Sequence, residues 1–178
     1  MLKNDLIEIR QWRESDKENL VLHANNINVA ERLDKTFPFP YTISDAEVWI
    51  QLSQKDSPLQ KLAIVYNNQA CGAISIGFEV GYPGVNLPPN SAVMGYWLGE
   101  TFWNKGLITQ SVGLFIPYVF SQFNVNSILA YADENNAASN QVLRNNGFKL
   151  STLVINRIHR FTNKKINLLT YKLSKVEV

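Results

Sequence analysis

The sequence predicts a single α+β domain, residues 1–178, in which helices flank a mixed β-sheet. The first observation is the order of the expected elements, β-α-α-β-β-β-α-β-α-β-β, which places helices both before and between strands. The second is the length of 178 residues, which suits one domain with a sizeable core. The third is that no repeat, low-complexity segment or linker divides the chain.

The first third of the chain is expected to form one strand and then two helices. Residues 6–11 alternate isoleucine with charged side chains, which is a strand pattern. The segments S-D-K-E at 15–18 and S-D-A-E at 44–47 have the spacing of helix capping boxes. One helix is therefore expected from the first box to about Ala24, and another after the second box. Prolines break the segment 32–41 between them, which is expected to be a loop.

The middle of the chain is expected to contain three strands. Apolar residues at 61–66 and 70–78 flank Asn67-Asn68, and this arrangement predicts a β-hairpin. The segment 81–90 is rich in glycine and proline and is expected to be a loop. Residues 92–98 form the next expected strand.

The last third is expected to alternate helices and strands. A helix is predicted over 107–122, with a kink at Pro117 because proline removes one backbone hydrogen bond. A strand follows at 127–132. A helix is then expected over 136–145, ending before Gly147, which suits a left-handed helix cap. Two strands, over 148–158 and 166–173, are expected to close the chain as a hairpin.

Composition and charge exclude several classes of function. The net charge of +2 is too small to indicate a nucleic-acid partner. No apolar run approaches the length of a membrane span and no signal peptide is evident, so a cytoplasmic protein without a membrane partner is expected. Cys71 is the only cysteine, which rules out an intrachain disulfide, and it is expected to be a small core side chain. No metal is expected.

The segment 103–109 stands where a glycine-containing loop, 100–106, becomes a helix. Backbone amides at a helix start lack acceptors, and the helix dipole adds positive charge there. Gly106 permits close approach of a ligand to the backbone, and Lys105 adds charge. This combination predicts an anion site suited to a pyrophosphate, although a lone Lys-Gly before a helix is more often just a turn. Further along, Asn136 and Ser139 share one face near the start of the next helix, where both also have the chemistry of helix caps.

Three motifs occur in one order along the chain. They are Gly-Tyr-Trp-Leu at 95–98, Trp-x-Lys-Gly at 103–106 and Asn-x-x-Ser-x-x-Val-Leu-x-x-x-Gly-Phe at 136–148. This ordered set resembles the GNAT acetyltransferases, and more closely their RimJ/RimL-type branch. The segments 9–12 and 37–47 are similar to that branch as well.

The resemblance implies a GNAT-like mixed, mostly antiparallel sheet of about seven strands flanked by about four helices. It also implies an N-acetyltransferase that transfers the acetyl group of acetyl-CoA to a primary amine, such as the N-terminal amine of a ribosomal protein, by direct attack in a ternary complex. Two alternatives stay open. One is an acetyltransferase for a small-molecule amine (a polyamine, an amino acid or an antibiotic), and the other is a non-catalytic acyl-CoA-binding module. Exposed strand edges also leave open a homodimer.

The same resemblance places acetyl-CoA against particular residues. The implied contacts are Trp97, Leu98, Trp103, Asn104, Lys105, Gly106, Leu107, Ile108, Thr109, Asn136 and Ser139. The amide of Leu98 is expected to hold the thioester carbonyl and its oxyanion. Asn136 is expected to bind the pantetheine arm, and Ser139 to hydrogen-bond or protonate the departing thiolate.

The sequence departs from the family pattern at three positions. Trp103 and Ile108 stand where the pyrophosphate loop usually has Gln or Arg and Gly or Ala, and Gln110 stands where many relatives carry Glu. Because Ile108 is bulkier than the usual residue, the tightness of acetyl-CoA binding is left open.

Proton removal and acceptor recognition involve other residues. An amine attacks a thioester only when neutral, so a base is needed unless the neutral fraction binds. Glu100 is the first candidate, and Asp133, Glu134, His159 or a water chain are alternatives; His23 is expected to be structural. Aromatic residues beside prolines predict an apolar wall for the acceptor. The expected acceptor-binding residues are Phe37, Phe39, Tyr41 and Tyr96.

Overall fold

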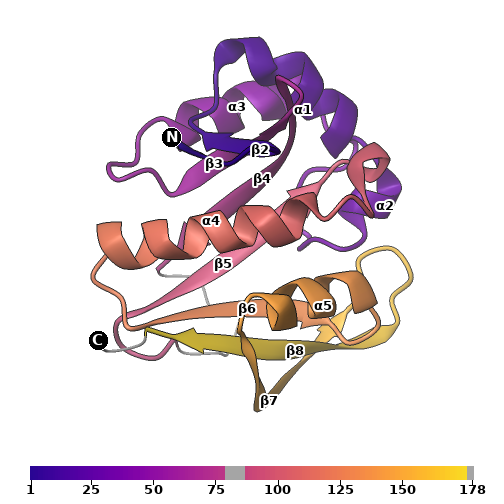
Figure 1. The fold of residues 1–178 in the computed structure, drawn as a ribbon. Coiled ribbons are helices and arrows are strands. Elements are labelled where there is room, and N and C mark those ends of the chain that lie inside the picture. Colours follow the sequence, from indigo (N-terminus) through magenta and orange to yellow (C-terminus); the bar gives the residue numbers. More distant parts are fainter. Residues whose placement is uncertain (79–86, 176–178) are drawn as a thin grey trace. The chain divides into compact units, whose positions relative to one another are not determined.

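The protein was analysed as a computed structural model that describes residues 1–78 and 87–175 (Figure 1). It divides into two compact units. Unit 1 comprises Met1–Ser75 and Tyr96–Phe115, and unit 2 comprises Ile76–Gly95 and Ile116–Val178. Residues 81–86 of the predicted loop over 81–90 lie outside the described residues. The extent of the single domain predicted over 1–178 stays a prediction.

Five strands contribute to unit 1, in the hydrogen-bonded order β1-β2-β3-β4-β5. They are β1 (Leu2–Lys3), β2 (Ile7–Arg10), β3 (Lys61–Tyr66), β4 (Gln69–Gly77) and β5 (Ser91–Leu98). The pairs β1–β2, β2–β3 and β3–β4 are antiparallel. Asn67 and Asn68, with φ of 49° and 63°, form the tight turn between β3 and β4, as predicted.

Three helices pack on these strands around an apolar core. They are α1 (Lys17–Ala24), α2 (Ile27–Ala30) and α3 (Ile43–Ser53). The core cluster consists of Trp12, Leu20, Ala24, Tyr41, Ala46, Ile50, Ala63, Val65, Ala70 and Ala73. The cluster includes residues of α1 and α3, and its burial removes apolar surface from water and so holds these two helices on the sheet.

Both predicted capping boxes are wrong in position. Helix α3 is capped by Thr42, whose Oγ1 accepts from the amide of Asp45 at 3.2 Å while the Asp45 carboxylate accepts from the amide of Thr42 at 2.8 Å. The box therefore lies at 42–45, and the segment 44–47 is already inside the helix. The chain enters α1 through a 3₁₀ turn at Glu14–Asp16 instead of through a cap at Ser15.

That 3₁₀ turn forms because Asp16 is bound to two groups earlier in the chain. Its carboxylate accepts from Nη1 and Nη2 of Arg10 at 2.7 and 2.9 Å, and from the backbone amide of Arg13 at 2.9 Å. Asp16 and Arg10 are both buried, and donation of these hydrogen bonds to Asp16 raises the pKa of the Arg10 guanidinium. The end of β2 is thus fixed to the start of α1 by a buried two-point ion pair.

Unit 2 contains residues 91–95 of β5 and three further strands, in the hydrogen-bonded order β5-β6-β8-β7. They are β6 (Ser127–Asp133), β7 (Lys149–Ile158) and β8 (Lys165–Ser174). The β5–β6 pair is parallel, with Ser91 opposite Ser127, and the β6–β8 and β7–β8 pairs are antiparallel. Helix α4 (Leu107–Gln122) begins in unit 1 and ends in unit 2, and α5 (Ala137–Asn145) follows β6.

The described residues confirm the predicted fold class, a mostly antiparallel mixed sheet with helices. They form eight strands and five α-helices, against the expected seven or so and four or so. The additions are β1 and α2, which are too short to leave a periodic pattern. Gly147, with φ of +80°, follows α5 as expected. Pro117 lies inside α4, and its kink stays a prediction.

Cys71 is a core residue, as predicted. Its thiol is buried and donates to the carbonyl of Ile64 at 3.4 Å, and burial raises its pKa to about 12. In the part of the chain that the structure describes, no helix has the length and hydropathy needed to cross a membrane. The cytoplasmic location and the homodimer stay predictions.

Replacing Asp16 by Ala should reduce the free energy of unfolding by about 3 to 5 kcal/mol, because the Arg10 guanidinium would stay buried without its partner. Urea unfolding followed by circular dichroism measures this change. Lys17→Ala is the control, since it breaks a neighbouring ion pair (Nζ to Glu47 Oε1, 2.8 Å) that is more exposed. Equal losses in both variants would contradict the importance of the buried pair.

Candidate functional site

In unit 1 the candidate site is built at the carboxyl end of β5. The amide of Gly99 donates to the carbonyl of Cys71 at 2.8 Å and ties this end to β4. A Cβ at Gly72 would overlap the carbonyl oxygen of Trp97 and lie 2.9 Å from Cα of Leu98, so β4 approaches β5 this closely only because residue 72 is glycine. Because successive amides of an extended chain point to opposite sides, the Leu98 amide points away from β4.

The loop after β5 leads into the N-terminus of α4, next to which the space at Gly106 is unoccupied. A 3₁₀ turn at Glu100–Phe102 is followed by Asn104 and Gly106, with φ of 61° and 72°, and α4 begins at Leu107. Where Gly106 would carry a Cβ there is no atom within 4 Å. Backbone amides in the first turn of a helix have no intrahelical acceptor. An exposed left-handed glycine at such a helix start fits the pyrophosphate site that the sequence predicts.

Trp103, one of the departures from the family pattern, closes this loop onto β5. Its indole Nε1 donates to the carbonyl of Leu98 at 2.8 Å, and the guanidinium of Arg32 lies over its ring at 5.4 Å from the centroid. Lys105 is exposed, and its ammonium lies 5.5 Å from the ring centroid of Phe102 and 5.8 Å from that of Tyr66. The side chain of Trp103 therefore anchors the loop to the end of β5. Ile108 is half-buried and Leu107 is buried.

Glu100 is exposed and its carboxylate is held by two amides. Oε2 accepts from Nδ2 of Asn26 at 2.8 Å, and Oε1 accepts from Nδ2 of Asn28 at 2.9 Å. These hydrogen bonds, with Asn28 contributing most, lower the pKa of the Glu100 carboxyl, and the charge of Arg32 lowers it further. A carboxylate stabilised in this way is a weaker proton acceptor, which does not favour the predicted role as base.

The predicted acceptor residues are partly brought together. The ring of Phe37 lies 5.2 Å from that of Tyr41 and 5.8 Å from that of Trp97, the latter edge to face. Tyr41 is buried in the core, and burial raises its pKa, so packing is the favoured role for this residue. Phe39 and Tyr96 are half-buried.

The two histidines have structural surroundings. His23 is buried, and its ring lies edge to face on that of Phe102, with the centroids 5.0 Å apart. Its Nε2 lies 3.1 Å from the side-chain nitrogen Nε2 of Gln69. Burial lowers the pKa of His23, which keeps it neutral. These contacts favour the predicted structural role of His23, which lies with Leu20 and Ala24 on the buried face of α1. His159 Nδ1 accepts from the amides of residues 161 and 162 in the β7–β8 turn, both at 3.3 Å.

In unit 2 the candidate residues gather at the start of α5. Asn136 is the N-cap, as its alternative interpretation predicted, since its Oδ1 accepts from the amide of Ser139 at 3.2 Å. Asp133 Oδ1 accepts from the amide of Asn135 at 2.8 Å. The carboxylate of Glu134 accepts from Nδ2 of Asn167 at 3.1 and 3.2 Å. Asp133 thus has a hydrogen-bond partner nearby in sequence, and Glu134 has one on β8.

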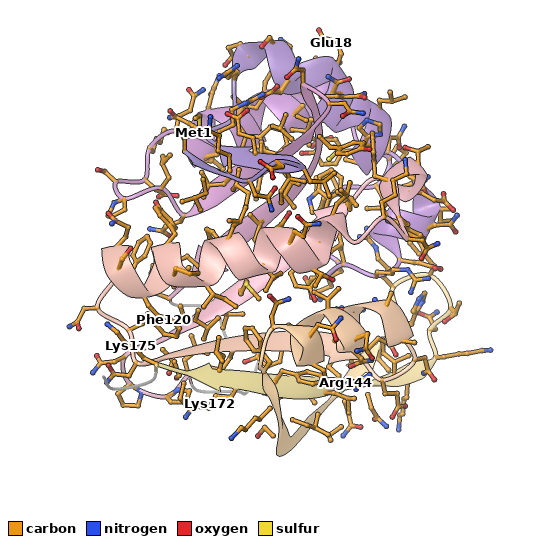
Figure 2. All side chains as sticks on the ribbon, in the orientation of Figure 1. Met1, Glu18, Phe120, Arg144, Lys172 and Lys175 are labelled. Carbon is orange, nitrogen blue, oxygen red and sulfur yellow. The ribbon has the colours of Figure 1, made fainter. Side chains whose placement is uncertain are left out.

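A buried network that the sequence analysis missed fixes this helix start to the sheet. Asn140 Nδ2 donates to the carbonyls of Asp133 and Asn136, both at 2.9 Å, and its Oδ1 accepts from the Tyr171 hydroxyl at 2.9 Å. Nη1 of Arg144, labelled in Figure 2 on α5, donates to the same hydroxyl at 3.2 Å. The spacing of four residues between Asn136 and Asn140 is the local signal in the sequence for this network. Tyr171, the partner of Asn140 on β8, is distant in sequence.

The predicted site residues therefore fall into two groups. Leu98 and residues 103–109 belong to unit 1, while Asn136 and Ser139 belong to unit 2. Across residues 1–78 and 87–175, no group of three or more His, Cys, Asp or Glu side chains is arranged to hold a metal ion. The absence of a metal from the reaction stays a prediction.

Comparisons with known proteins agree with this architecture. A family model described as "Acetyltransferase (GNAT) domain" matches residues 7–149, well over half of the chain. One relative, the "Putative ribosomal N-acetyltransferase YdaF" of Bacillus subtilis (strain 168), is 26% identical over 152 residues, covering 82% of this chain and 79% of the relative.

Two solved structures share the fold. RimL, a ribosomal alpha-N-protein acetyltransferase in complex with coenzyme A, matches with a TM-score of 0.79 and 18% identity over 96% of this chain and 95% of its own. The microcin self-immunity acetyltransferase MccE, in complex with acetyl-CoA and AMP, matches with a TM-score of 0.78 and 23% identity over 97% and 94%. The predicted GNAT fold is confirmed.

Replacing Tyr171 by Phe should lower the free energy of unfolding by about 1 to 3 kcal/mol, because the buried Oδ1 of Asn140 would lose its donor. Chemical denaturation measures the loss. Tyr66→Phe is the control, at a tyrosine whose ring makes the contacts with Phe102 and Lys105. A Tyr171→Phe protein as stable as the wild type would show that the network does not hold α5.

Proposed function

Because the chain belongs to the GNAT family of acetyltransferases, we propose that it transfers the acetyl group of acetyl-CoA to the N-terminal amine of a ribosomal protein. Family membership makes the chain an acetyl-CoA-dependent N-acetyltransferase and supports acetyl-CoA as its cosubstrate. The observation that carries the proposal is the open start of α4 at the left-handed Gly106. The acceptor class rests on the name of the Bacillus subtilis relative, which also supports the RimJ/RimL-type branch.

The acetyl-CoA contacts follow from the direction of the backbone. The amides of Lys105, Gly106, Ile108 and Thr109 would hold the pyrophosphate, where the helix dipole favours negative charge. The remaining proposed contacts are Trp97, Leu98, Trp103, Asn104, Leu107, Asn136 and Ser139. Because the register of β5 with β6 covers Ser91–Met94, Leu98 lies beyond these paired residues. Its amide, which points away from β4, would hold the carbonyl of the acetyl group.

The chemistry requires a neutral amine and a stabilised leaving group. Acetyl-CoA supplies the acetyl group as a thioester, and the amine attacks its carbonyl carbon. The Leu98 amide would donate to the carbonyl oxygen as negative charge develops there. The Ser139 hydroxyl would donate to the departing thiolate, which leaves when the carbon–sulfur bond breaks. Phe37, Phe39 and Tyr96 would line the acceptor side.

The first experiment is calorimetric titration with acetyl-CoA and with free CoA. Micromolar binding is expected in the wild type. Gly106→Ala should weaken binding about tenfold or more, because alanine is strained by about 1 to 2 kcal/mol at a positive φ and its methyl group would occupy the approach to the helix start.

The matched control is Gly77→Ala, since an added Cβ there also meets no atom within 4 Å but φ is not positive. An absence of binding at millimolar acetyl-CoA, or equal effects of the two substitutions, would reject the proposed cosubstrate site.

A screen of acceptor amines tests the second part of the proposal. Peptides with ribosomal-protein N-termini should be acetylated, and Ser139→Ala should lower kcat at least about tenfold while the Kd for acetyl-CoA changes less than about twofold. Turnover of polyamines, amino acids or antibiotics but not of peptides would favour a small-molecule acceptor. Binding without turnover of any amine would favour a non-catalytic acyl-CoA-binding module.

A further inference from the structure

Two segments of unit 1 that are distant in sequence are fastened together by exposed side chains. One is the α2 segment, residues 26–32, and the other is the β5 exit loop, residues 99–106. Asn26 and Asn28 both donate to the carboxylate of Glu100, and Arg32 lies over the ring of Trp103. We call the three side chains of Asn26, Asn28 and Glu100 the carboxylate clasp.

The carboxylate clasp is fixed by hydrogen bonds both at Glu100 and at Asn26. Each carboxylate oxygen of Glu100 accepts one hydrogen bond from an asparagine side chain, at 2.8 and 2.9 Å, so the carboxylate is held at two points. Asn26 is also the N-cap of α2, because its Oδ1 accepts from the amide of Asn28 at 2.8 Å. The side chain that starts α2 is therefore the same one that binds Glu100, which ties the position of the helix to the loop.

The clasp joins the two chain segments that lead to the two parts of the proposed site. After α2, the chain reaches Phe37, whose ring packs on Trp97 of β5. After Glu100, the chain reaches Trp103, whose indole donates to the carbonyl of Leu98, and then the amides at the start of α4. A shift of α2 relative to the loop would thus move the acceptor wall relative to the acetyl-CoA loop.

We propose that Glu100 is a positioning residue and not the general base: its ionised carboxylate, held by Asn26 and Asn28, fixes the acceptor-binding segment against the acetyl-CoA loop. This inference rests on the proposed function. In the ionised form both oxygens accept strongly, whereas protonation makes one of them a hydroxyl that accepts more weakly, so the clasp is strongest with the ionised form. The two hydrogen bonds lower the pKa of Glu100, whereas a base works best with a pKa near the working pH.

Steady-state kinetics with a peptide acceptor that has a free N-terminal amine separate the two roles. Glu100→Ala and Asn28→Ala should each raise KM for the acceptor about threefold or more, with the Kd for acetyl-CoA within about twofold of wild type. The double variant should be no worse than Glu100→Ala alone, because that substitution already removes both hydrogen bonds of the clasp, whereas Asn28→Ala removes one of them. Glu100→Gln, which keeps one acceptor oxygen, should have an intermediate KM and the wild-type shape of the pH–rate profile.

A base would give a different set of results. Glu100→Gln would then lower kcat by about a hundredfold or more and remove the acid limb of the pH profile, and Asn28→Ala would leave the acceptor KM unchanged. Either result overturns the proposal. Glu47→Gln, at a partly exposed carboxylate that accepts one side-chain donor (Lys17 Nζ, 2.8 Å), is the control and should leave the kinetics unchanged.

A measurement without activity keeps this test separate from the proposed function. The carboxyl carbon of Glu100, followed by NMR in the full chain, should titrate below its ordinary pKa and should shift upward in Asn28→Ala. An unshifted pKa in the wild type, or no change in the variant, would show that the clasp does not form in solution. A shifted pKa in a protein that binds no acetyl-CoA would instead reject the proposed function and leave the clasp in place.

Discussion

The close approach of β4 to β5 at Gly72 is the constraint on which the candidate site of unit 1 depends. With no side chain at residue 72, the carbonyl of Trp97 lies against the backbone of β4, and Gly99 can bond to Cys71. These contacts set the direction of the last amide of β5, at Leu98. Trp103 then uses the carbonyl of the same residue as the anchor for the loop, so both the proposed oxyanion donor and the proposed phosphate loop take their positions from one strand end.

Polar contacts in this protein differ in role according to their burial. The Arg10–Asp16 pair and the Asn140–Tyr171 bond are buried, where an unpaired group would be costly, and they attach α1 and α5 to the sheet. The contacts of Glu100 and Trp103 lie nearer solvent and join loops instead of layers. Solvent weakens such contacts, so they suit adjustment of a site more than stabilisation of a fold.

The departures from the family pattern have physical consequences that can be followed in the structure. At the first position of the loop, Trp103 brings an indole that bonds to the protein's own backbone and lies under Arg32. Gly106 keeps the backbone freedom that the loop needs. Ile108 is half-buried in the first turn of α4, so part of its bulk is directed into the protein. The loop therefore keeps an uncrowded left-handed glycine before the start of α4, while Trp103 anchors the loop to the protein's own backbone.

The sequence by itself determined the features that arise within a few residues. Alternation placed β2, and apolar residues on both sides of the two asparagines placed β3 and β4. The asparagines form the predicted turn, α4 lies within its predicted bounds, and Asn136 caps α5. The tertiary structure decided which side chains became partners over long distances. Asp16 turned to Arg10 and displaced the predicted cap at Ser15, Glu100 met amides more than seventy residues away, and Asn140 met Tyr171 across α5 and β8. Periodicity and caps are local and leave a pattern in the chain, whereas such partners are chosen only when folding brings distant segments together.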